Sequence, residues 1–487
     1  MHKQQSNDLE PMKIPKVLII YTGGTIGMKQ TPNGYAPSKG FLLQLMKTYV
    51  HQSNDVQKIR TKENQIIAYE ILEYELLIDS SNIQASNWNV IAQSIFENYH
   101  EYVGFVILHG TDTMAYTASA LSFMLVNLSK PVILTGSQIP ISESRSDATE
   151  NLIGAITLAG SYSIPEVGVY FNNRLFRGNR VQKVDSSGLG AFDSGNYPLL
   201  AEAKIRFEVF WKNILKVGPN KILLRNIQSQ PIVSLKLFPS IDINIIKNIL
   251  HPPIKGLIIE SYGAGNFPSN RSDIIEEFQK AINRGVIIVN CTQCQKGGVT
   301  KDYETSRLLY EIGVVPSGDM TVETTLCKMM YLLSQQDVST DEIRKLMSVD
   351  LRGEISVAVR QDIQRGEELL LYLVKQIQQD FGKIQDEHAI ERIKIILLCR
   401  AIIENELQDF ERFIDDDIDV NKANHHGEYP ILLSVIHNRP FFVQKLLEKG
   451  CNPNTQDEYG NTPLRIAIQN QFSECIQLLR QNGGHVI

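Results

Sequence analysis

Two threonines follow apolar runs that have the length of a β-strand. The first run, residues 17–20, leads into Thr-Gly-Gly-Thr, which ends at Thr25. The second run, residues 103–108, leads into His-Gly-Thr-Asp-Thr, which contains Thr111. A threonine hydroxyl can act as a covalent nucleophile when a neighbouring group removes its proton. Because open α/β sheets bind ligands at the carboxyl ends of their strands, we predict one site that contains both hydroxyls.

The glycine-rich turn at 22–27 differs from the loops that bind nucleotides. It lacks the Gly-Lys-Ser/Thr of a P-loop and the Gly-x-Gly-x-x-Gly of dinucleotide folds. Backbone N–H groups in such a turn suit a carboxylate or an oxyanion. Tyr35 follows in a polar loop, 29–39, that has the composition of a mobile lid. The alternative is a tight strand-to-helix turn that binds nothing.

Three further polar positions could serve the same site. Asp112, beside Thr111, could bind an amino group or orient a base, and the hydroxyls near Asp79 could hold a carboxylate. Lys183 ends the basic segment 172–183, and would be a base if desolvation and nearby cations lowered its pKa. Each position has an ordinary alternative, which is a helix cap for the first two and a solvated basic loop for the third.

The elements that must position these residues alternate between strands and helices, which predicts a mostly parallel sheet with helices on both faces. A second α/β stretch follows, and the polar segment 200–230 is expected to join the two. The expected strands are 17–20, 103–108, 132–134, 167–171, 254–259 and 286–289, and the expected helices are 88–102, 114–128, 273–284 and 323–333.

The last part of the chain repeats itself with a period of 33 residues. The matched pairs are Gly427 and Gly460, Pro430 and Pro463, Gly450 and Gly483, and Asn421 and Asn454. This period resembles the ankyrin repeat, and a degenerate earlier unit fits residues 395–421. Tyr429 and Arg465 depart from the family's Thr-Pro-Leu-His, which puts the hydrogen bonds of that histidine in doubt. A plain helical tail is the alternative.

Composition narrows the class of protein. A chain of 487 residues with a net charge of −6 and no long Lys/Arg cluster argues against a nucleic-acid partner. The first 290 residues contain no cysteine, and Cys291-x-x-Cys294 has no second pair at zinc spacing, so neither a disulfide framework nor a metal site is expected. The N-terminus is too polar for a signal peptide, and no apolar run reaches the ~18 residues of a membrane span. We therefore predict a cytoplasmic protein without a membrane segment, metal or cofactor.

Joined in order, the polar segments resemble the bacterial-type L-asparaginases, a two-threonine family, in its cytoplasmic type I branch. The resemblance covers residues 15–354, and the trailing repeats are similar to those of animal asparaginases that have been linked to lysophospholipase activity. The matching segments are Thr-Gly-Gly-Thr-Ile-Gly (22–27), Asp-Ser-Ser (79–81), His-Gly-Thr-Asp-Thr-Met (109–114), Thr-Gly-Ser-Gln-Ile-Pro (135–140), Arg-Ser-Asp (145–147), Phe-Asn-Asn-Arg-Leu-Phe-Arg-Gly-Asn-Arg (171–180), Ser-Tyr-Gly-Ala-Gly-Asn (261–266) and Gly-Asp-Met-Thr-Val-Glu (318–323).

The resemblance implies an asparaginase fold. It comprises a flavodoxin-like parallel-sheet N-terminal lobe and a smaller α/β C-terminal lobe, here followed by an all-α ankyrin tail. The boundaries that we predict are 15–205 for the N-terminal lobe, 225–355 for the C-terminal lobe, 361–390 for a helical linker and 391–487 for the repeats.

The resemblance also implies residue roles. Thr25 would be the nucleophile and Tyr35 its partner, while Thr111, Asp112 and Lys183 would form a second triad. The substrate's α-amino and α-carboxylate groups would bind Asp79, Ser80, Ser81 and Asp112, with Thr111 beside them.

The implied reaction converts L-asparagine to L-aspartate and ammonia in a homodimer or homotetramer, without a metal. Some type I enzymes also carry an allosteric asparagine site, but Glu260 stands here where a regulated bacterial enzyme has arginine, which argues against that site. Alternatives are a glutaminase or related amidohydrolase, and a non-catalytic scaffold whose repeats bind a protein partner.

Overall fold

The computed structural model describes residues 14–486, except 33, 38, 50–56, 62–64, 218–219, 300–303, 337, 357–385, 415–417, 425–426 and 458–459. The chain forms two compact units, one made of residues up to 357 and the other made mainly of residues from 358 onward. Most of the predicted linker, 361–390, lies outside the described residues.

A nine-stranded sheet organises the N-terminal lobe, in the order β14-β13-β10-β9-β8-β6-β1-β5-β4. Its five central strands, from β9 to β5, are parallel. Numbered along the chain, these five follow the flavodoxin-like order 2-1-3-4-5, so the strand order reverses between β1 and β6. The strands are β1 Lys16–Tyr21, β4 Lys58–Arg60, β5 Ile66–Glu73, β6 Gly104–Leu108, β8 Val132–Thr135, β9 Val167–Phe171, β10 Arg174–Arg177, β13 Ala201–Ala203 and β14 Phe207–Val209.

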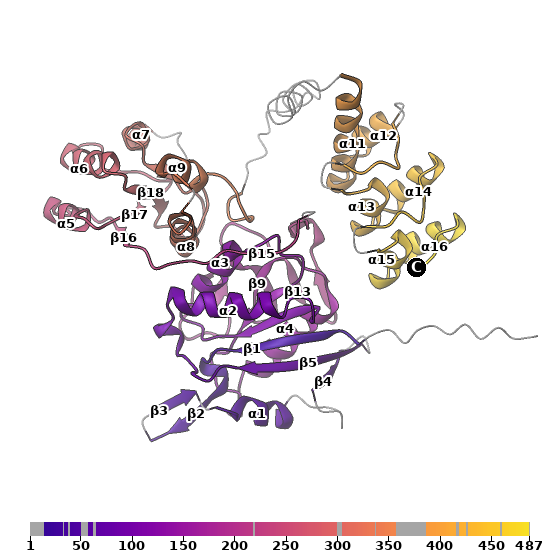
Figure 1. The fold of residues 1–487 in the computed structure, drawn as a ribbon, viewed down its shortest axis with the longest axis horizontal. Helices are drawn as coiled ribbons and strands as arrows, with labels where there is room; N and C mark the ends of the chain where they lie inside the picture. The colour runs from indigo at the N-terminus through magenta and orange to yellow at the C-terminus, as the bar shows by residue number, and fades with distance from the viewer. Residues whose placement is uncertain are drawn as a thin grey trace, which may run out of the picture. The chain divides into compact units, whose positions relative to one another are not determined.

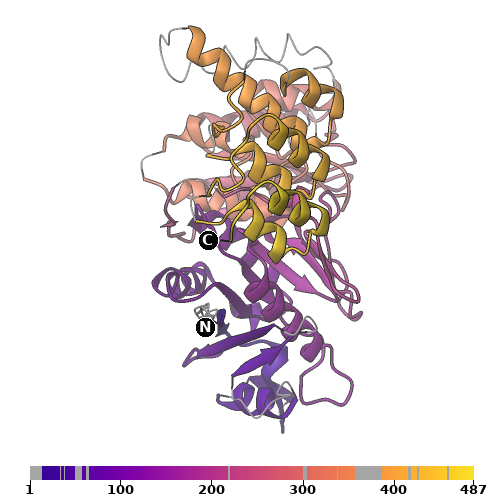
Figure 2. The same ribbon diagram turned by 90° about the vertical axis from the view of Figure 1, so that its right-hand side faces the viewer.

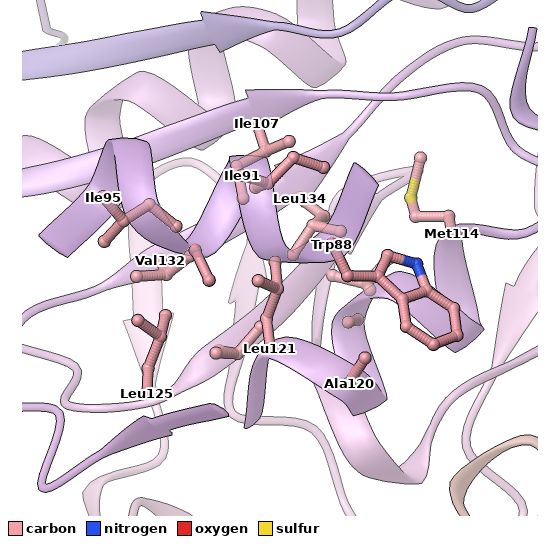
Figure 3. Packing of buried hydrophobic residues seen from close by; sticks show 14 of the residues in the cluster. Trp88, Ile91, Ile95, Ile107, Met114, Ala120, Leu121, Leu125, Val132 and Leu134 are labelled. Atoms are coloured by element: carbon pink, nitrogen blue, oxygen red, sulfur yellow. The ribbon is translucent and has the colours of Figure 1, made fainter. Parts of the chain in front are cut away.

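Both faces of this sheet are covered by helices, as its continuous apolar strands predict. Alternate residues of β1 point to opposite faces, so Leu18 and Ile20 join one core while Val17 and Ile19 join the other. Figure 3 shows the first core, in which Trp88 and Ile91 of α2 pack over the sheet. The helices of the first face are α2 Ala85–Glu97 and α3 Met114–Met124, and those of the second are α1 Phe41–Tyr49 and α4 Ala148–Ser161.

Shorter elements complete the lobe. They are the 3-10 turns η1 Thr25–Gly27, η2 Ser80–Asn82, η3 Gly178–Arg180 and η4 Trp211–Asn213, the hairpin β2 Met28–Thr31 with β3 Gly34–Pro37, and the pairs β7 Leu125–Val126 with β15 Leu223–Leu224 and β11 Gln182–Lys183 with β12 Phe192–Asp193.

Several expected boundaries differ from the structure. Helix α3 ends at Met124, before the expected 128, because the chain turns there into β7 to pair with β15. Helix α2 ends at Glu97 rather than 102. The segment 200–230 is more than a connection, because β13 and β14 within it extend the large sheet. The predicted boundary at 205 therefore falls between two paired strands.

The C-terminal lobe is built on a four-stranded parallel sheet, β16-β17-β18-β19 (Figure 1). Its strands are β16 Ile232–Lys236, β17 Gly256–Ser261, β18 Ile287–Thr292 and β19 Val315–Pro316. Its helices are α5 Ile243–Ile249, α6 Ser272–Asn283, α7 Glu304–Glu311, α8 Val322–Leu333 and α9 Thr340–Met347.

Buried charges join the two lobes. Arg180, 2% exposed, donates to both carboxylate oxygens of Asp319 in the C-terminal lobe, at 3.0 and 2.6 Å. Arg177, 4% exposed, pairs with Glu166 at 2.6 Å and donates to Gly353 O at 3.1 Å. The alternative of a solvated basic loop at 172–183 is therefore wrong for these two arginines.

In the part of the second unit that the structure describes, three helix pairs stack in series, as the 33-residue period predicts (Figures 1 and 2). Asn421 Oδ1 accepts from the N–H of Asn452 and Asn454 Oδ1 accepts from that of His485, each over 31 residues and 2.7 Å. Thr462 caps α15, whereas Tyr429 at the matching position makes no side-chain cap. The helices are α11 Asp386–Glu404, α12 Leu407–Ile414, α13 Pro430–Ile436, α14 Pro440–Glu448, α15 Pro463–Gln469 and α16 Ser473–Gln481.

Candidate active site

The three polar strand ends meet at the point where the strand order reverses. The side chain of Thr22 donates to Leu108 O at 2.9 Å, which ties the end of β1 to the end of β6. Ile78 N donates to Thr22 O at 2.8 Å and so brings in the segment that follows β5. The turns that contain Thr25, Ser80 and Thr111 thus form one edge, as expected for strands that end side by side.

Glycines allow these turns to touch. A Cβ on Gly24, whose φ is +87°, would lie 2.4 Å from Gly110 N. A Cβ on Gly110 would in turn lie 2.4 Å from Ser80 Oγ. Any side chain at either position would push the turns apart, because both contacts are far inside van der Waals distance. Close packing of the turns therefore explains the glycines at these positions of the Gly-Gly-Thr and His-Gly-Thr motifs.

Lys183 contacts both other members of the predicted second triad, Thr111 and Asp112. Its Nζ donates to Thr111 Oγ1 at 2.9 Å and to Asp112 Oδ1 at 2.8 Å. Lys183 is largely buried, with 19% of its side chain exposed, whereas 62% of the Asp112 side chain is exposed. The charged neighbour of Lys183 is the carboxylate of Asp112, which is an anion rather than a cation.

The predicted carboxylate-binding segment, Asp79 to Ser81, borders the same edge. Asp79 accepts hydrogen bonds from the N–H and the hydroxyl of Ser81, at 2.9 and 2.7 Å, and so caps the turn η2. Ser80 is 3% exposed, and its carbonyl accepts from the Thr113 hydroxyl at 2.7 Å. The cap predicted as the alternative is thus present, on a half-buried Asp79 beside an exposed Ser81.

Tyr35 lies on β3 of the hairpin that follows η1, and β3 contacts η1 directly. Its side chain is 47% exposed, and its hydroxyl donates to Glu143 Oε1 at 2.8 Å. This hydrogen bond and the negative charge of Glu143 raise the pKa of Tyr35. Tyr35 is therefore carried by a hairpin next to the Thr25 turn, whereas Lys183 contacts the Thr111 turn.

Gln138 is a site neighbour that the sequence interpretation did not single out. Its Oε1 accepts from the Thr111 hydroxyl at 3.3 Å, and its Nε2 donates to Gly188 O at 3.1 Å. Asp147 fixes the backbone here by accepting from the N–H groups of Gln138 and Ile139. The segment Thr-Gly-Ser-Gln-Ile-Pro, which follows a strand of the same sheet, was the available signal.

A buried histidine supports the Thr111 turn. His109 is 1% exposed, its Nδ1 donates to Gly110 O at 2.7 Å, and its Nε2 accepts from the Thr117 hydroxyl at 3.0 Å. Trp88 Nε1 donates to that hydroxyl at 3.0 Å, which leaves the hydroxyl proton for the imidazole. This arrangement suits a neutral ring, and burial lowers the pKa of His109 to about 4.

This neutral histidine should make the protein less stable in mild acid. Between pH 6.5 and 4, the histidine is protonated in the unfolded state, where its pKa is near 6.5, but stays neutral in the folded state. The free energy of unfolding therefore falls as the pH drops from about 6.5 towards 4. The full loss is about 3 kcal/mol. We expect urea unfolding of the H109Q variant to depend less on pH in this window than unfolding of the wild type. The exposed His100, changed to glutamine, is the control, and equal slopes in wild type and H109Q would refute the assignment.

Other candidate features do not add to the site. Cys291 is buried on β18 and Cys294 is exposed, and both are free thiols. Glu260 accepts from the hydroxyl of Ser234 at 2.9 Å. Within the described ranges, no cluster of His, Cys, Asp or Glu is placed to hold a metal ion. None of the helices among the described residues has both the length and the hydropathy of a membrane span.

A flavodoxin-like lobe with two threonine turns at its switch point, followed by a parallel four-stranded lobe, defines the asparaginase fold. Family comparison matches "Asparaginase, N-terminal" at 16–215, "Glutaminase/Asparaginase C-terminal domain" at 232–347 and "Ankyrin repeats (3 copies)" at 398–487. The chain therefore belongs to the asparaginase family, in its type I branch, with ankyrin repeats.

Individual relatives agree with this assignment. The L-asparaginase of Dirofilaria immitis is 36% identical over 96% of this chain and 82% of its own length. L-asparaginase 1 of Escherichia coli K12 is 45% identical over 71% of this chain and 99% of its own. The 60 kDa lysophospholipase of Mus musculus is 36% identical over 89% of this chain and 79% of its own. The structure of L-asparaginase I from Vibrio cholerae superposes with a TM-score of 0.64, at 40% identity, over 71% of this chain and 100% of that chain.

Proposed function

We propose that the protein hydrolyses L-asparagine to L-aspartate and ammonia through a covalent intermediate on Thr25. The observation that carries the proposal is the contact of Lys183 with Thr111 and Asp112, at an edge shared with the Thr25 turn. Amide hydrolysis needs a nucleophile, donors for the oxyanion and a proton for the departing amine. Threonine, tyrosine and lysine side chains supply these functions at one edge of the sheet.

In the first proposed step, Thr25 Oγ1 forms a bond to the carbon of the substrate's side-chain amide. Backbone N–H groups of the glycine turn stabilise the resulting oxyanion. The C–N bond then breaks, and the proton of the Thr25 hydroxyl, taken up through Tyr35, leaves with the nitrogen as ammonia. An aspartyl ester on Thr25 remains.

In the second proposed step, a water molecule activated at Thr111 attacks that ester. Asp112 also binds the α-ammonium of the substrate, which is a cation that competes with Lys183 for the same carboxylate. Lys183, whose Nζ contacts both Thr111 and Asp112, completes the group that supports Thr111 in this step. The water proton passes through Thr111, and Thr25 regains its hydroxyl as aspartate leaves.

The test of function is amidase activity of the purified full-length protein over a concentration series of asparagine and glutamine. We expect ammonia and aspartate in equal amounts from asparagine, and a lower kcat/KM for glutamine because its longer side chain displaces the amide from Thr25. A preference for glutamine would support the glutaminase alternative. The absence of ammonia from both substrates would refute the proposal and favour a non-catalytic scaffold.

A second candidate activity is hydrolysis of a lysophospholipid ester. The relative in Mus musculus is named a 60 kDa lysophospholipase, and the same hydroxyl could attack an ester carbonyl. Release of fatty acid from lysophosphatidylcholine, measured on the same preparation, would show whether this protein shares that activity.

The assembly and partners belong to the same proposal. We infer a cytoplasmic homodimer or homotetramer, as the resemblance to type I enzymes implies, without a metal or other cofactor. We call the unit of residues up to 357 the catalytic unit and the unit from 358 onward the ankyrin unit. The ankyrin unit would bind a protein partner or dock on the catalytic unit. The carboxylate of Glu260 argues against a regulatory asparagine site of the bacterial kind, so the asparagine series should follow a hyperbolic curve.

A further inference from the structure

One short segment, residues 138–143, contacts all three parts of the candidate site. Its first residue, Gln138, accepts from the Thr111 hydroxyl at 3.3 Å. In its middle, the N–H of Ile141 donates to the carbonyl of Ile26, next to Thr25, at 3.2 Å. Its last residue, Glu143, accepts from the Tyr35 hydroxyl at 2.8 Å. The segment therefore contacts both threonine turns and the tyrosine, all of which are distant from it in the sequence.

The contact of Glu143 with Tyr35 fixes an otherwise exposed part of the site. Tyr35 is carried by a two-stranded hairpin, β2 with β3, and such a ribbon is only marginally stable on its own. Hydrogen bonding and charge from Glu143 raise the pKa of Tyr35. Lys29, on the paired strand, lies over the ring of Phe41, 5.9 Å from its centre. Glu143 is thus the charged group that holds the tyrosine hydroxyl in the described part of the chain.

We propose that Glu143 is a positioning residue, whose carboxylate holds the Tyr35 hydroxyl and the β2–β3 hairpin beside the Thr25 turn. This inference rests on the proposed function, in which Tyr35 is the partner of Thr25. The hydrogen bond requires the phenol proton, so the arrangement is lost when Tyr35 ionises. Activity should consequently fall as the pH rises through the pKa of Tyr35.

The experiment compares two substitutions of Glu143. We expect E143A, which removes the acceptor, to lower kcat for asparagine by about 10- to 100-fold while KM changes by less than about threefold. E143Q keeps an acceptor oxygen and should retain most of kcat. Because it removes the charge that raises the pKa of Tyr35, its alkaline limb should move to lower pH. E150Q removes an exposed carboxylate from the first turn of α4 and serves as the charge control, with kcat and the pH profile unchanged.

A double-mutant cycle with Y35F separates positioning from a general structural effect. If Glu143 acts through the tyrosine hydroxyl, E143A should have no further effect on kcat in the Y35F background. Additive losses, or an E143A variant with wild-type kcat and pH profile, would overturn the inference. Failure of the proposed function is recognised separately, because the wild-type protein would then release no ammonia, or T25A would still release it.

Discussion

T25A is expected to lower kcat for asparagine by at least about 10⁴-fold, because it removes the proposed nucleophile. Thr25 opens the turn η1 and is half-buried, so the loss of its Oγ1 and Cγ2 atoms should leave the fold intact. T25S keeps a hydroxyl at the same place and is the matched control, with most of the activity retained. Initial rates of aspartate formation measure the effect, and a T25A rate near that of the wild type would show the mechanism to be wrong.

Trapping the intermediate tests the division of labour between the two threonines. The variant K183M removes the donor that contacts Thr111 and Asp112, but leaves the Thr25 turn untouched. If Thr25 forms the ester and Thr111 activates water, K183M should accumulate an aspartyl adduct that intact-mass measurement detects after acid quenching. T25A should form none. An adduct on T25A would show that Thr25 does not form the ester. The absence of an adduct on K183M, despite slow turnover, would contradict the role of the Thr111 group in activating water.

K328M should destabilise the catalytic unit by about 3–5 kcal/mol, because it leaves a buried carboxylate without its cation. Lys328 and Glu354 are both 0% exposed, and their charged atoms lie 2.6 Å apart. Lys328 also donates to Val349 O at 2.5 Å, and Glu354 accepts from the N–H of Leu351 at 2.9 Å. Burial lowers the pKa of Lys328 despite its partner, and burial with the charge of Glu354 raises the pKa of Asp350 to about 6.

Urea unfolding followed by tryptophan fluorescence suits this measurement. The only two tryptophans of the chain, Trp88 and Trp211, lie in the catalytic unit, so the signal does not report on the ankyrin unit. The double variant K328M/E354Q should be more stable than the sum of its single changes predicts. K204M breaks a surface pair, in which Lys204 is 56% exposed, and should leave the midpoint unchanged. A K328M midpoint equal to that of the wild type would contradict the prediction.

The sequence indicated that the two threonine turns follow strands of one sheet, because each turn comes after a buried apolar run, 17–20 or 104–108. The neighbouring strand β5 was harder to recognise, since Glu70 and Glu73 interrupt its apolar pattern and several of its residues are only half-buried. The ankyrin period was visible because its anchors recur at fixed spacing. In that unit the hydrogen bonds of Asn421 recur at Asn454.

Long-range partners explain what the sequence did not reveal. Arg180 and Arg177 have the composition of a solvated loop, and their acceptors at Asp319 and Gly353 lie 139 and 176 residues away. Glu143 lies 108 residues after Tyr35 and falls between the two matching segments 135–140 and 145–147, outside both. Side-chain types alone do not reveal such pairs, because only the folded chain brings donor and acceptor together.

The asparagine contacts of the second unit set a rule for how this chain can vary in length. Asn421 donates to Gly450 O and Asn454 to Gly483 O, each over 29 residues, so each contact spans most of one 33-residue repeat and recurs in the next. An insertion of a few residues between a donor and its acceptor would misalign the contact, whereas an added complete repeat would reproduce it. The length of this unit is therefore expected to change by complete repeats only. Recombination can add such repeats to the stack while the catalytic unit keeps its sequence.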